Sequence, residues 1–144
     1  MRNSERAGKP GWAYWAIAAA ALAWNALGCI DFTLTASRTP VYLAQMKPEV
    51  IDWLDSAPTW SMAAWALGVG GGAAGALLLL LRSHFAPVAF AASLTGLGLT
   101  QAWQVASPMP GGTFAASAMS ALIWIVAIAL LWFAWRQRRA GVLR

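Results

Sequence analysis

The sequence is poor in the side chains that form metal sites, cofactor sites and disulfides. Its 144 residues include one cysteine, Cys29, and one histidine, His84. A disulfide within the chain or a redox dithiol needs two cysteines, and a bis-histidine haem or a zinc site with several protein ligands needs more histidine and cysteine than the chain has. We therefore expect no cofactor and no metal site.

Charged residues are also scarce, at 10% of the chain against about a quarter in a typical globular domain. The sequence has no phosphate-binding G-x-x-x-x-G-K-[ST] loop, and its glycine cluster GVGGGAAG lies inside an apolar run. No set of nucleophile, base and metal ligand can be assembled, so we expect no enzyme activity. The basic residues lie between apolar runs and near the chain ends, which argues against a nucleic-acid partner.

Apolar residues, in contrast, make up 60% of the chain and gather in four runs, at residues 11–33, 59–81, 87–105 and 113–135. A helix rises about 1.5 Å per residue, so runs of this length can cross a bilayer. Within lipid the backbone must satisfy its own hydrogen bonds, and short connections make neighbouring helices antiparallel. The sequence predicts an all-α fold, a single domain over residues 1–144 that forms an integral membrane four-helix bundle.

The distribution of Lys and Arg predicts the orientation of this bundle. Eight of the ten basic residues fall on one side of the predicted spans: Arg2, Arg6, Lys9, Arg82, Arg136, Arg138, Arg139 and Arg144. The first loop carries only Arg38 and Lys47, outnumbered by three acidic residues. Because cytoplasmic loops are enriched in Lys and Arg, both termini are expected in the cytoplasm.

The chain up to Cys29 has some features of a cleavable signal, with a basic start and an apolar middle. Asn25 interrupts the apolar stretch, however, and bulky Leu27 occupies a position near the cleavage motif that favours small residues. We expect this segment to remain as the first helix.

Asp31 is the only acidic residue inside or beside an apolar run. A carboxylate within a membrane is costly, which makes Asp31 a candidate for a proton or cation role. The favoured alternative places it at the outer interface, where it caps polar groups or pairs with Arg38. Asn25 lies deeper, and its amide is expected to hydrogen-bond across helices.

The first outer loop contains a short helical pattern. Pro48 suits a helix start, Glu49 suits the first turn, and Pro58 ends the element. Its apolar side consists of Val50, Ile51, Trp53 and Leu54. We expect a short interfacial helix, which is either a lid over a site beneath it or, as the favoured reading, a simple membrane anchor.

The second span carries a stripe of small residues at helical spacing: Ser61, Ala64, Gly68, Gly71, Gly72 and Gly75. Two overlapping GxxxG patterns lie in it, and such faces let helix backbones approach closely in lipid. We interpret Ala64 and the glycines as a helix-packing surface. Its partner is another helix of this chain, the favoured alternative, or a second copy.

Polar and tryptophan residues gather in the outer half of the predicted bundle. The candidates for a polar cavity are Asn25, Asp31, Ser61, Trp65, Thr100, Trp103, Gln104, Ser117, Ser120 and Trp124. A polar pocket with aromatic walls suits a small polar or cationic molecule. The alternative is that these residues serve helix packing and interfacial belts, as Ser, Thr and Trp commonly do.

Scattered motifs over residues 11–143 carry a family resemblance. They include Trp24-Asn25, Gly28, Asp31, Pro58, Trp60, the stretch Ala64-Trp65-Ala66-Leu67-Gly68-Val69, Gly75, the leucines before Arg82, Ala86, Phe90, Ser93-Leu94 and Leu131-Trp132-Phe133-Ala134. In these positions the chain resembles a family of small four-span bacterial inner-membrane proteins, uncharacterised or loosely labelled as sugar transporters. The resemblance implies this architecture and location, although Phe32 stands where a tyrosine is expected.

Two functions are consistent with these features. The first is a non-enzymatic polytopic membrane protein that packs with itself or with other membrane subunits through small-residue helix faces. The second is a transporter or binding protein for a small solute, sugar-like or cationic, with an outward-facing cavity. The expected partners are the lipid bilayer, a second copy or another membrane protein, and a small-molecule ligand.

Overall fold

The computed structural model describes residues 8–144, which form six α-helices and no strand. The helices are α1 (Trp12–Ala36), α2 (Pro40–Leu43), α3 (Pro48–Asp55), α4 (Thr59–Leu80), α5 (Ala86–Ala106) and α6 (Phe114–Arg139). The all-α prediction is confirmed, and the four long helices begin and end within a few residues of the predicted runs. Arg2 and Arg6, which contribute to the predicted orientation, lie outside the described residues.

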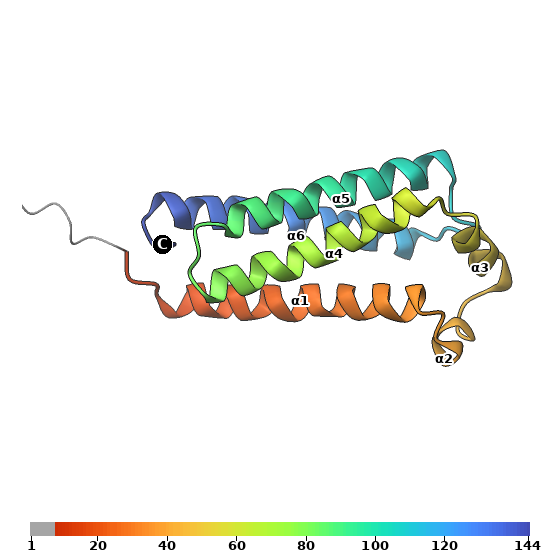
Figure 1. The fold of residues 1–144 in the computed structure, drawn as a ribbon, viewed down its shortest axis with the longest axis horizontal. Coiled ribbons are helices and arrows are strands. Elements are labelled where there is room, and N and C mark those ends of the chain that lie inside the picture. The colour runs from red at the N-terminus through yellow and green to blue at the C-terminus, as the bar shows by residue number, and fades with distance from the viewer. Residues whose placement is uncertain (1–7) are drawn as a thin grey trace, which may run out of the picture.

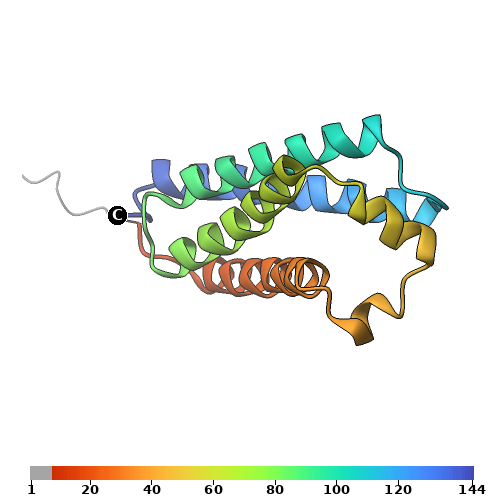
Figure 2. The same cartoon turned by 45° about the vertical axis from the view of Figure 1, so that its right-hand side comes forward.

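The four long helices lie side by side, and α2 and α3 lie together at one end of them (Figures 1 and 2). The start of α1, the α4–α5 turn and the end of the chain lie at the opposite end. We call these two ends the α3 end and the basic end. Within residues 8–144, three helices, α1, α4 and α6, are long and apolar enough to cross a membrane. The fourth, α5, has 21 residues and carries Gln101 and Gln104, which lower its hydropathy.

Local sequence explains where the helices stop. Three of them end where the next residue but one adopts a left-handed backbone: Arg38 after α1, Arg82 after α4 and Gly141 after α6. At Arg82 the following amide, Ser83 N–H, donates to Leu78 O at 2.8 Å, which satisfies a carbonyl that the helix end leaves free. Pro48 opens α3 as predicted, which confirms the short helix in the first loop.

The helices pack most closely where α4 meets α5 and α1. A Cβ added to Gly71 would lie 2.9 Å from Ser93 N on α5, and one added to Gly75 would lie 2.8 Å from the Phe90 ring. A Cβ on Gly72 would overlap Asn25 Oδ1 on α1. Further along, Gly68 lies against α5 and Ala64 is buried. The predicted stripe therefore lies against helices of the same chain.

The apolar core lies towards the basic end. Phe90 of α5 and Leu79 of α4 are its largest fully buried side chains, and the Tyr14 hydroxyl of α1 donates to Leu79 O. Val142 and Leu143, which follow α6, are also buried there. This core joins all four long helices.

Candidate functional site

A small cleft of about 70 Å³ lies at the α3 end. It is lined by residues of α3, of the segment after it, of the first turns of α4 and of the last turns of α5: Trp53, Leu54, Ala57, Ser61, Met62, Trp65, Thr100, Trp103 and Gln104. Five of these, Ser61, Trp65, Thr100, Trp103 and Gln104, belong to the predicted cavity. Antiparallel packing of α4 on α5 brings them together.

One wall of the cleft is the short helix α3. The Trp53 ring packs on the Trp103 ring with a centroid distance of 4.4 Å, and Trp53 Nε1 donates to Ser107 O at 2.7 Å. Trp103 is left 9% exposed. The sequence places Trp53 on the apolar side of α3 but does not reveal its partner, because that depends on how the loop folds back. In this structure α3 covers the cleft.

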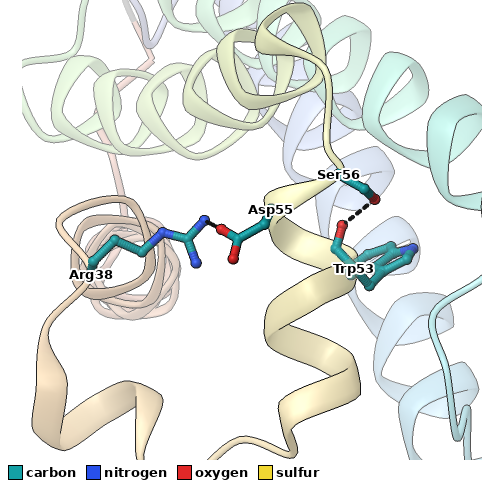
Figure 3. A network of polar contacts seen from close by, with 4 residues as sticks. All are labelled: Arg38, Trp53, Asp55 and Ser56. Atoms are coloured by element: carbon teal, nitrogen blue, oxygen red, sulfur yellow. Dashed lines mark hydrogen bonds and ion pairs between the residues drawn. The ribbon is translucent and has the colours of Figure 1, made fainter.

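A second contact attaches α3 to the segment after α1, on a different side of the helix from Trp53. Arg38, after the end of α1, forms an ion pair with Asp55, while Ser56 Oγ donates to Trp53 O at 2.7 Å (Figure 3). Figure 3 shows the Asp55 carboxylate and the Trp53 ring leaving α3 on different sides. The helix is thus joined to α1 by charge and to α5 by an aromatic pair.

The chemistry of the cleft is limited by its polar groups. Ser61 Oγ donates to Pro58 O at 2.8 Å and Thr100 Oγ1 donates to Gly96 O at 2.9 Å, so both hydroxyls bond to nearby backbone. Among the described residues, the Gln104 amide has no hydrogen-bond partner, and it offers both a donor and an acceptor. The lining contains no charged side chain.

The volume of the cleft limits the size of the molecule that it can hold. Small-molecule pockets usually measure about 300–1,000 Å³, and a water molecule takes about 30 Å³ in the liquid. The cleft can hold water or a few heavy atoms while α3 stays in place. This volume is below that of a usual pocket for a sugar-sized solute.

Three predicted cavity residues lie on α6, away from this lining. Ser120 Oγ and Trp124 Nε1 donate to Gln101 Oε1, at 3.1 Å and 3.4 Å, and so join α6 to α5. Ser117 is exposed. Gln101 is not among the predicted cavity residues, although a glutamine in a membrane-length helix is itself a signal of interhelical bonding.

Asn25 does not line the cleft either. Its Nδ2 donates to Ala21 O at 2.8 Å within α1, while Oδ1 lies against Gly72 of α4. The predicted hydrogen bond across helices is therefore wrong for this amide. Gly72 lacks a side chain, so Asn25 meets a flat backbone surface.

Asp31 is exposed and accepts a hydrogen bond from the Tyr42 hydroxyl of α2. This bond raises the pKa of Tyr42 above its ordinary value of 10.0. The alternative that pairs Asp31 with Arg38 is wrong, because the left-handed turn at Arg38 directs its guanidinium to Asp55. Helix α2 has four residues and shows no periodicity, although Pro40 at its first position is a start signal.

Known proteins offer no guide to this arrangement. No protein-family model matches the chain, and no curated protein or solved structure is significantly similar to it. In the described part of the chain, no three metal-ligating side chains come together.

Proposed function

We propose that the chain is a non-enzymatic membrane protein of the bacterial inner membrane whose four spans are α1, α4, α5 and α6. Support for a fourth span comes from the way α5 packs. Gly96 lies against Gly68 and Ala64, Ser93 against Gly71, and Phe90 against Gly75. These contacts follow most of the length of α4, so α5 should lie at the same depth in the bilayer as α4.

The proposed orientation places the basic end in the cytoplasm. In residues 8–144 this end holds Lys9, Arg82, Arg136, Arg138, Arg139 and Arg144, whereas all described acidic residues lie towards the α3 end. A surplus of Lys and Arg close to the spans is typical of the cytoplasmic side. The cleft then opens on the outer side.

The protein associates with a second copy or another membrane subunit through small residues of α1. The stripe on α4 is covered within the chain, but Ala13, Ala16, Ala20 and Ala23 of α1 are exposed and share one helix face. Small residues spaced in this way let another helix approach closely in lipid. The exposure of this alanine face is the observation that carries the proposal.

The test is the mass of the assembly in nanodiscs or mild detergent. The double variant Ala16→Leu, Ala20→Leu adds bulk to the exposed face without entering the core, so it should dissociate the assembly and leave a monomer that still unfolds cooperatively. The control is Ala121→Leu, on an exposed part of α6, which should leave the assembly intact. A wild-type protein that is monomeric and retains no partner contradicts the proposal.

The second candidate function is binding or transport of a small solute at the cleft. The convergence of five predicted residues, one of which is the unpartnered Gln104, favours it. In proteoliposomes that take up a monosaccharide, Gln104→Leu should abolish uptake because it removes that amide. The exposed serine variant Ser117→Ala should have no effect. Equal uptake by both variants would exclude this role for the cleft.

A further inference from the structure

One face of α6 changes in character along its length. Ile125, Ile128, Trp132, Trp135, Arg136 and Arg139 fall within about 100° of the helix circumference at about 100° per residue, and we call them the α6 stripe. Its apolar and aromatic members are exposed: Ile125 by 65%, Ile128 by 54%, Trp132 by 56% and Trp135 by 46%. Towards the basic end the stripe runs from aliphatic to aromatic to cationic.

The arginine side chains of the stripe stack on its tryptophan rings. The Arg139 guanidinium lies 3.6 Å from the centroid of the Trp135 ring, and that of Arg136 lies 5.4 Å from the Trp132 ring. A guanidinium over an aromatic face keeps its N–H groups free at its edges, where they can bind phosphate through two hydrogen bonds. The tryptophans thus keep both arginines close to the helix.

These arginines have no acidic partner in the described part of the chain. The ion pair there joins Arg38 to Asp55 at the α3 end, and the basic end of residues 8–144 contains no Asp or Glu. Within residues 8–144, no acidic side chain is therefore placed to neutralise them. Trp and Arg next to an apolar helix surface match the successive layers of a lipid molecule, with its acyl chain, its glycerol region and its phosphate.

We propose that the α6 stripe binds an anionic phospholipid, with its acyl chain along Ile125 and Ile128, its glycerol region at the tryptophans and its phosphate on Arg136 and Arg139. This rests on the proposed insertion of α6 in the membrane and is independent of association through α1. The occupant is a lipid and not free phosphate, because the stripe continues as an apolar surface well beyond the arginines.

The experiment counts lipids retained by the full chain. The protein is taken from nanodiscs that contain equal phosphatidylcholine and phosphatidylglycerol, and native mass spectrometry compares the two lipids. Wild type should retain phosphatidylglycerol preferentially. The double variant Arg136→Gln, Arg139→Gln should lower this preference about thirtyfold, since each basic residue near an anionic surface contributes about 1 kcal/mol and each 1.4 kcal/mol is a factor of about ten.

Matched variants separate a site from a general charge effect. Arg38→Gln with Lys47→Gln removes the same charge at the α3 end and should leave lipid retention unchanged. Ile128→Ser should weaken retention, whereas excess inorganic phosphate should not displace the lipid. Equal loss in both double variants, an unchanged preference in Arg136→Gln, Arg139→Gln, or displacement by phosphate would overturn the proposal. So would a second copy of the chain covering the stripe, which would appear as a dimer that these arginine substitutions dissociate.

Discussion

The hydroxyl of Tyr42 shows how one hydrogen bond outside the spans can be tested. It donates to Asp31, and this bond raises the pKa of Tyr42 above 10.0. A raised pKa means that the folded state holds the proton more tightly, so the stabilisation is complete below about pH 10 and is lost as the pH rises through the raised value. The contact should join α2 to α1 at neutral pH.

We predict that Asp31→Ala lowers the pKa of Tyr42 towards its ordinary value. The measurement is the absorbance of tyrosinate during a pH titration, and the difference from Tyr42→Phe isolates Tyr42 from Tyr14. An unchanged midpoint in Asp31→Ala would show that the carboxylate does not hold this hydroxyl.

Two glycines of α4 provide a matched pair for the packing of the bundle. A Cβ on Gly72 would overlap Asn25 Oδ1, whereas one on Gly70 would meet nothing within 4 Å. We expect Gly72→Ala to destabilise the protein by about 1–3 kcal/mol through overpacking. Gly70→Ala should be stabilising by about 0.5–1 kcal/mol, because alanine loses less backbone entropy in a helix.

Thermal unfolding in one detergent measures both effects. Because the obstacle at Gly72 is the Asn25 amide, the double variant Gly72→Ala, Asn25→Ala should recover most of the lost stability. If Gly72→Ala is as harmless as Gly70→Ala, α1 does not lie against α4 as described.

At the scale of a single element, the two sets of contacts that hold α3 in place contribute unequally to its stability. Trp53 contributes an aromatic pair and a hydrogen bond, each worth about 0.5–1.5 kcal/mol. The ion pair between Arg38 and Asp55 is exposed, and such pairs contribute about 0.2–1 kcal/mol. The indole should therefore hold α3 over the cleft more firmly than the charges.

We predict that Trp53→Ala speeds hydrogen exchange of the backbone amides of α3 and leaves that of α4 and α5 nearly unchanged. Arg38→Ala should have a smaller effect on the same amides. Trp60→Ala, which removes an exposed tryptophan next to the same segment, is the control. Exchange that rises more in Arg38→Ala than in Trp53→Ala would reverse the assignment.

The elements differ in how far local sequence predicts them. The long helices follow from apolar runs, and α3 follows from Pro48, because these signals are local and repeat along the chain. The sequence does not predict helix α2, because four residues carry no period. Side-chain partners were harder to predict. The Asn25 amide donates to the backbone of its own helix, and the Ser120 and Trp124 side chains donate to Gln101. These partners depend on the rotation of each helix about its axis, which packing determines.

At the scale of the whole molecule, the α3 end and the basic end differ in structure. The basic end carries the buried core around Phe90 and Leu79, together with the chain segment after α6. The α3 end carries the cleft and two short helices. The sequence predicted this asymmetry from the placement of Ser, Thr and Gln. It left α3 as either a lid or an interfacial anchor, and only the fold places Trp53 of α3 against the cleft.

The proposed function and the lipid inference both depend on α6 lying in a membrane. The proposed topology also depends on a fourth span, α5. Of the four long helices, α5 is the one whose hydropathy alone does not mark it as a span. Its close packing against α4 is therefore the feature on which the topology depends. If α5 crosses, the α4–α5 turn and the loop before α6 lie on opposite sides of the bilayer.

Labelling of single cysteines in intact bacterial cells tests this most directly. In a Cys29→Ser background, a membrane-impermeant maleimide is applied to Ser37→Cys, His84→Cys, Gly112→Cys and Ala140→Cys, all at exposed positions. The four-span bundle predicts labelling at 37 and 112 from outside, and at 84 and 140 only after lysis. Labelling of 84 and 112 from the same side would contradict it, because α5 would then not cross the membrane.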